Sequence, residues 1–202
     1  MLRHSSRAFE ALAFVGVGVF IVVCVAAQFL RTDLDWIEAP LSAYLMGPGG
    51  AIVKAAYVAL SCALVALGFA FRRALTPVAR SVVPPALFAA AGMALTVTAF
   101  SQLPFGVDPS GWHAFVHGIA AMTTFLCVTV AMLLQSWWLR ADARWRNRFG
   151  FAFGWAVATF MALWIYALVH DLPRGLTQKI VIALILGWLA WAAVALLRRR
   201  IN

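Results

Sequence analysis

Long runs of apolar residues, separated by short polar segments, dominate the chain. A helix needs about 20 mainly apolar residues to cross the hydrocarbon core of a bilayer. Six runs reach that length, at about residues 9–30, 51–71, 83–104, 113–139, 149–170 and 179–197. We therefore predict an all-α, polytopic membrane bundle of six transmembrane helices that forms a single domain over residues 1–202.

The composition supports a membrane protein. Of the 202 residues, 64% are hydrophobic and only 11% are charged, whereas a soluble domain is about half apolar and one-quarter charged. This excludes soluble enzyme folds and disordered chains. The first run is longer than the apolar core of a signal peptide, which spans about 7–15 residues, so we expect it to remain as a helix.

Positive charge is concentrated in alternate connections of the predicted bundle. Twelve of the 16 Lys and Arg lie in the two terminal segments and in the connections after the second and fourth runs. Five of the seven acids lie in or beside the other connections: Asp33, Asp35, Glu38, Asp108 and Asp171. This is the pattern of the positive-inside rule. It predicts a bacterial cytoplasmic (inner) membrane protein with both termini in the cytoplasm, and it assigns the net charge of +9 to lipid headgroups and not to nucleic acid.

Tryptophans lie beside several predicted helix ends, as in the aromatic belts of membrane proteins. Trp36 and Trp112 flank the non-cytoplasmic ends, and Trp137, Trp138 and Trp145 flank a cytoplasmic one. We therefore expect these five side chains at the membrane interfaces.

Small residues recur every four positions in the fifth run, at Gly150, Gly154, Ala158 and Ala162. Such a stripe lets another helix approach closely. We expect that helix to belong to the same bundle; a homodimer seam or a contact with a different membrane protein is the alternative.

The segment 31–50 is amphipathic and ends in Gly-Pro-Gly-Gly. These features predict an interfacial or re-entrant segment followed by a tight turn.

Uncommon polar residues gather at the non-cytoplasmic ends of the predicted helices. Polar and ionisable groups are costly inside a membrane and often mark functional sites. His113 and His117, for example, are one helical turn apart and share a face. The candidates for a pocket at this side are Ser42, Tyr44, Lys54, Gln102, Asp108, His113, His117, Tyr166, His170 and Asp171.

Several functions fit this distribution. The first is a pocket without a resident cofactor that binds a membrane lipid or an amphipathic small molecule, with histidine and Lys54 against its polar or anionic headgroup. The alternative is an intramembrane hydrolase in which His113, His117, His170 and Asp108 hold a divalent metal such as Zn²⁺. A haem between His117 and His170 and a purely structural or interaction role remain open, as does whether the protein is an enzyme.

Short motifs add a resemblance. They are Leu-Ser-Ala-Tyr-Leu at 41–45, Leu-Pro-Phe-Gly-Val-Asp at 103–108 and Trp-His-Ala-Phe-Val-His-Gly at 112–118. Together they resemble the bacterial and archaeal six-helix membrane family DUF998 (domain of unknown function 998) over nearly the whole chain. The resemblance implies the six-helix fold and no known activity, and its family-like positions are Ser42, Asp108, His117 and Gly118. A more distant likeness to six-span proteins of the Frag1/DRAM type would favour lipid handling.

Overall fold

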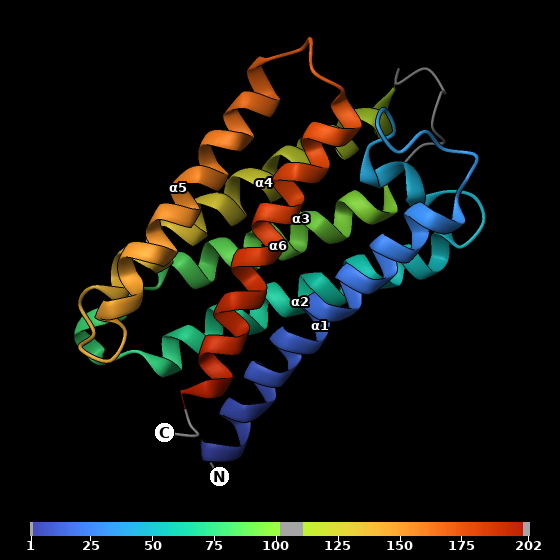
Figure 1. Ribbon diagram of the computed structural model, residues 1–202. Helices are drawn as coiled ribbons and strands as arrows, with labels where there is room; N and C mark the ends of the chain where they lie inside the picture. The colour runs from blue at the N-terminus through green and yellow to red at the C-terminus, as the bar shows by residue number, and fades with distance from the viewer. Residues whose placement is uncertain (1, 102–110, 200–202) are drawn as a thin grey trace.

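A computed structural model describes residues 2–101 and 111–199, and within them six helices are long and apolar enough to cross a membrane (Figure 1). The helices are α1 (Leu2–Leu30), α2 (Gly50–Ala74), α3 (Val83–Phe100), α4 (Trp112–Leu139), α5 (Arg146–Leu168) and α6 (Arg174–Arg198). The described residues form no strand. The prediction of an all-α, multi-pass membrane bundle is confirmed, and the six helices lie where the apolar runs placed them, with ends that differ by a few residues.

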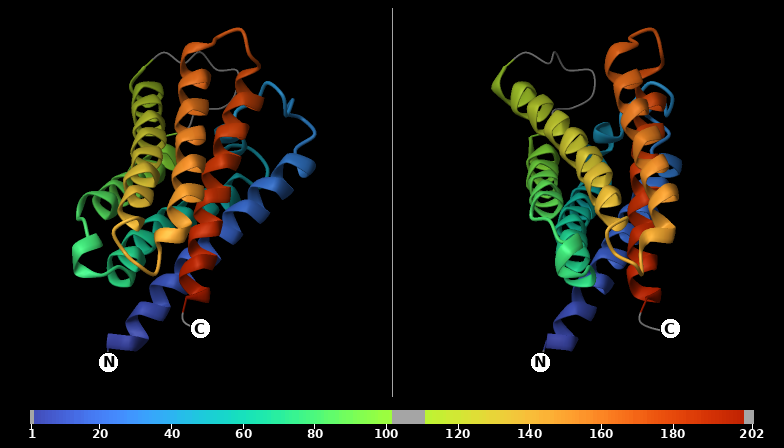
Figure 2. Two further views of the ribbon diagram at one scale, coloured as in Figure 1. Left: turned by 60° about the vertical axis from the view of Figure 1, so that its left-hand side comes forward. Right: turned by 90° about the vertical axis from the view of Figure 1, so that its left-hand side faces the viewer.

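Both chain termini lie at one end of the bundle, here called the termini end (Figures 1 and 2). The α2–α3 connection, with the short 3₁₀ helix η2 (Pro77–Ala79), and the α4–α5 connection lie at the same end. The opposite end, called the distal end, carries the 3₁₀ helix η1 (Leu41–Leu45) and the α5–α6 connection. Each helix packs on its neighbour in the chain, and α6 returns to pack on α1 and α5.

Trp188 of α6 lies at the centre of the packed core. Its side chain is fully buried, and its ring centroid lies 6.3 Å from those of Phe71 on α2 and Phe88 on α3. Its indole Nε1 donates a hydrogen bond to the Ala152 carbonyl oxygen of α5 at 3.1 Å. One side chain therefore joins four helices.

Trp145 departs from the aromatic-belt prediction. It immediately precedes α5 and is fully buried, with its ring centroid 5.8 Å from that of Phe71. The short α4–α5 connection turns the side chain back into the bundle, so the interfacial prediction is wrong for this residue. Trp36 and Trp112 are exposed, as a belt residue would be.

The small-residue stripe of α5 does not pack inside the bundle, contrary to the prediction. A β-carbon added to Gly150 or Gly154 would meet no atom within 4 Å, and Ala158 is exposed. A close helix approach occurs elsewhere: a β-carbon on Gly92 of α3 would lie 2.7 Å from the Ser61 carbonyl oxygen of α2. Sequence spacing identified small residues but not the face that they occupy.

The segment between α1 and α2 forms a cap over the distal end. In η1 every side chain except that of Ser42 is buried. The Leu176 amide at the start of α6 donates to the Ile37 carbonyl oxygen at 2.7 Å. Gly47 and Gly49 have φ angles of 77° and 76°, which glycine adopts without steric cost. The predicted tight turn into α2 is therefore present.

Candidate functional site

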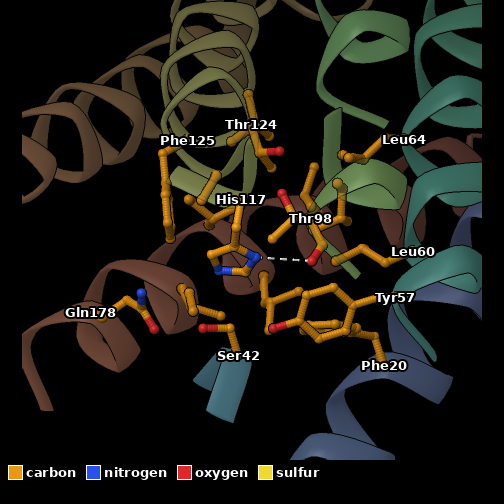
Figure 3. Close-up of a pocket in the computed structure, with 17 residues that line it drawn as sticks. Phe20, Ser42, Tyr57, Leu60, Leu64, Thr98, His117, Thr124, Phe125 and Gln178 are labelled. Atoms are coloured by element: carbon orange, nitrogen blue, oxygen red, sulfur yellow. Dashed lines mark hydrogen bonds between the residues drawn. The ribbon is translucent and has the colours of Figure 1, made fainter. Parts of the chain in front are cut away.

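A cavity of about 80 Å³ lies inside the distal half of the bundle, beneath the cap (Figure 3). Its walls come from α2, α3, α4 and α6, with Phe20 of α1 and Ser42 of η1. Among the described residues, α5 contributes none to the lining. The cavity is therefore a space between packed helices, closed at its distal side by the segment that follows α1.

The lining changes from polar to apolar with depth. Along α4 it runs from His117 to Val128, and along α6 from Gln178 to Leu189. At 1.5 Å per residue each stretch is about 16 Å long, close to half of a hydrocarbon core about 30 Å thick. On α4 only Thr124 interrupts the apolar wall beyond His117. The cavity thus has the polarity profile of one membrane leaflet.

His117 is half-buried in the lining, and one of its nitrogens is fixed. Its Nδ1 lies 3.1 Å from the Thr98 carbonyl oxygen. Thr98 belongs to the last turn of α3, where carbonyls lack a donor inside the helix. Because a carbonyl oxygen can only accept, Nδ1 carries the proton, and the contact leaves Nε2 for the cavity.

Ser42 and Tyr57 face the same space as His117 (Figure 3). Ser42 is the second residue of η1. Tyr57 lies on α2, where its ring is held against Phe20 with centroids 5.1 Å apart. Three polar side chains from three elements thus converge at the distal part of an otherwise apolar cavity.

Gln178 completes the polar end but has little free hydrogen-bonding capacity. Its Oε1 accepts from the Leu41 amide at 2.9 Å, which ties η1 to α6. Its Nε2 donates to the Tyr166 hydroxyl at 3.4 Å. We therefore regard Gln178 as a residue that positions the cap.

Charged side chains of the distal end are engaged within the cap and beside it. Arg31 forms two 2.7 Å hydrogen bonds with the Asp33 carboxylate and donates to the Met46 carbonyl oxygen at 2.6 Å. The hydrogen bonds from Arg31 lower the pKa of Asp33. Lys179 donates to the Trp36 carbonyl oxygen. None of these residues lines the cavity.

The structure brings only two of the predicted pocket residues, Ser42 and His117, into the cavity lining. Tyr166 stands directly behind it, with its ring centroid 6.3 Å from that of the lining residue Phe125. Gln102 and Asp108 lie outside the described residues.

The remaining candidates lie elsewhere. Tyr44 is buried beside a separate groove between α1 and α2. The Lys54 ammonium lies 3.9 Å from the Met46 sulfur and not at the cavity. Three further candidates are exposed, namely His113, His170 and Asp171.

The described residues do not form the predicted metal site. Within 2–101 and 111–199, no three His, Cys, Asp or Glu side chains are grouped closely enough to hold a metal ion. His170 bonds the Leu168 carbonyl oxygen through Nδ1 at 3.0 Å, in the exposed α5–α6 connection. The three histidines are therefore not brought together; the version of the site that includes Asp108 involves a residue outside the described part.

Three polar contributors were not among the predicted residues: Tyr57, Thr98 and Gln178. A tyrosine and a glutamine inside apolar runs are signals that could have been used. Thr98 acts through its backbone carbonyl, which no side-chain pattern encodes. The meeting of η1, α2 and α4 depends on the fold and not on sequence spacing.

Comparison with known proteins places the chain in a family. None of the curated proteins or solved structures compared with the chain matches it, and the comparisons do not show the likeness to Frag1/DRAM-type proteins. One family model matches residues 14–195, from α1 to the last turn of α6. Because this match covers well over half of the chain, the protein belongs to the family described as "Protein of unknown function (DUF998)".

Proposed function

We propose that this protein binds the chain of a lipid or similar amphiphile in the distal cavity, with the polar group of the ligand against Ser42, Tyr57 and His117. The observation that carries the proposal is the gradient of the lining. Polar groups meet at one end and apolar side chains continue for about the depth of one leaflet. An amphiphile has the same arrangement.

The size of the cavity restricts what enters it. A single water needs about 10–15 Å³ of the same kind of volume, so 80 Å³ holds a handful of water-sized groups. Drug-sized ligands occupy roughly 300–1,000 Å³. The volume supports one narrow hydrocarbon chain and not a two-chain lipid taken in whole.

A cavity-filling substitution tests the binding. Ala121 lines the cavity on α4, and Ala158 is exposed on α5. We expect Ala121→Leu to reduce binding at least about tenfold, because the added carbons exclude two or more methylenes of the ligand at about 0.8 kcal/mol each. Ala158→Leu, the same change outside the cavity, should leave binding unaltered.

Native mass spectrometry and crosslinking by a diazirine-bearing oleoyl probe in phosphatidylcholine nanodiscs measure the effect. Crosslinks should map to cavity-lining peptides of α4 and α6. Equal crosslinking of both leucine variants, or labelling confined to exposed α5, would count against the cavity. Thermal unfolding confirms that both variants are folded.

We further propose that the termini end faces the cytoplasm of a bacterial inner membrane. The support is the segregation of twelve of the 16 basic residues to the segments at that end. A reporter that is active only outside the cytoplasm should be inactive when fused after Asn202 and active when inserted beside Asp171. The opposite pattern would overturn the orientation and place the cavity in the other leaflet.

A further inference from the structure

The cavity lining restricts the charge of the ligand. Among the described lining residues there is no Lys, Arg, Asp or Glu. Residues 102–110 also contain no Lys or Arg in their sequence. An unpaired charge is strongly disfavoured in apolar surroundings. A phosphate or carboxylate group placed against Ser42 and His117 would therefore lack a counter-ion.

The nearest basic residues of α6 do not supply one. Lys179 donates to the Trp36 carbonyl oxygen and lies over the Tyr44 ring at 5.4 Å. Arg174 donates to the Tyr166 carbonyl oxygen at 2.8 Å and lies over the ring of the same tyrosine at 4.5 Å. These cations hold the cap and the α5–α6 connection together, outside the cavity.

His117 instead offers a hydrogen-bond acceptor. Nδ1 is committed as a donor to Thr98, and the described cavity lining has no carboxylate to stabilise an imidazolium. Nε2 therefore presents a lone pair. It makes no hydrogen bond with the described residues, and the Ser42 and Tyr57 hydroxyls lie around the same space (Figure 3). A ligand hydroxyl could donate to Nε2 and accept from either protein hydroxyl.

We propose that the ligand is an uncharged, single-chain amphiphile whose polar group is a hydroxyl, such as a monoacylglycerol or a long-chain alcohol. The inference rests on the proposed function and names the class of ligand for the same cavity. It differs from the expectation drawn from the sequence, in which Lys54 meets an anionic headgroup, because Lys54 does not line the cavity.

Three probes with the same oleoyl chain separate the contributions. Monoolein has free hydroxyls, methyl oleate has no donor, and oleoyl lysophosphatidic acid adds a phosphate to the same glycerol. Each would compete with the diazirine-bearing oleoyl probe in phosphatidylcholine nanodiscs. We expect monoolein to bind about fivefold more tightly than methyl oleate, as one net hydrogen bond provides. Lysophosphatidic acid should bind at least tenfold more weakly than monoolein.

A matched pair of histidine variants tests the acceptor. His117→Leu should lower monoolein binding to the level of methyl oleate while leaving methyl oleate unchanged. His113→Leu makes the same change one turn earlier on α4, at an exposed position outside the cavity lining, and should preserve the preference for monoolein.

The outcomes separate this inference from the proposed function. If none of the three probes competes, the proposed function fails. If lysophosphatidic acid competes as well as monoolein, or if methyl oleate equals monoolein, chain binding stands and the inferred ligand class is wrong. Unchanged monoolein binding in His117→Leu would remove the role of Nε2.

Discussion

Replacing Trp188 with alanine should lower the free energy of unfolding by about 4 kcal/mol, as expected for truncation of a fully buried aromatic side chain. The indole packs between Phe71 and Phe88 and bonds the Ala152 carbonyl oxygen. Its loss would leave a cavity where α2, α3, α5 and α6 meet. Chemical unfolding in detergent micelles, followed by circular dichroism, measures the change.

Two further variants separate packing from polarity and from general effects of losing tryptophan. Trp188→Phe keeps most of the packed surface and removes the hydrogen bond, so a loss of about 1–2 kcal/mol is expected. Trp164 is 43% exposed on α5, so Trp164→Ala should cost less than about 1 kcal/mol. Similar losses for Trp188→Ala and Trp164→Ala would show that Trp188 is not the centre of the core.

The fold could be predicted from the sequence because two independent physical constraints agree. The length of an apolar run decides whether it can span a bilayer, and the Lys and Arg distribution decides which connections share a side. Both are local properties of the chain. Contacts between helices are not local, which explains the errors at Trp145 and Gly154. Each has the residue type typical of the predicted role, but its burial depends on which face turns toward the bundle.

The candidate site could be predicted only in part for the same reason. His117 was identifiable because an imidazole inside an apolar run is uncommon, and Ser42 was identifiable through a family-like motif. Neither signal indicated that the two side chains, 75 positions apart in the sequence, face one cavity. His113 and Lys54 are equally unusual in type, yet the rotation of α4 and α2 places them elsewhere.

Asp142 illustrates a buried polar residue whose role is structural. It lies in the α4–α5 connection at the termini end and is only 1% exposed. Its carboxylate accepts from the Thr76 amide at 2.8 Å and from the Arg144 amide at 3.0 Å. The guanidinium of Arg144 lies 3.6 Å away. One side chain thus fastens the α4–α5 connection to the α2–α3 connection.

Asp142→Ala should therefore lower the free energy of unfolding by about 3 kcal/mol, because the buried Thr76 and Arg144 amides lose their acceptors. The same unfolding measurement in micelles applies. Asp171→Ala removes an exposed carboxylate from the α5–α6 connection and should change stability by less than about 0.5 kcal/mol. Equal effects of the two variants would contradict the role of Asp142.

Acid should weaken the same link. Burial disfavours the charged form of Asp142, but the hydrogen bonds from the two amides and the charge of Arg144 outweigh it, so the pKa of Asp142 is lowered. A carboxylate with a lowered native pKa contributes stability above its unfolded value of about 3.9, and this contribution is lost as the pH falls through the native pKa. Asp142→Asn keeps one acceptor and does not titrate. The wild-type advantage over Asp142→Asn should therefore be constant above about pH 5 and shrink below pH 4. An advantage that persists unchanged in acid would show that shape and not charge fastens the two connections.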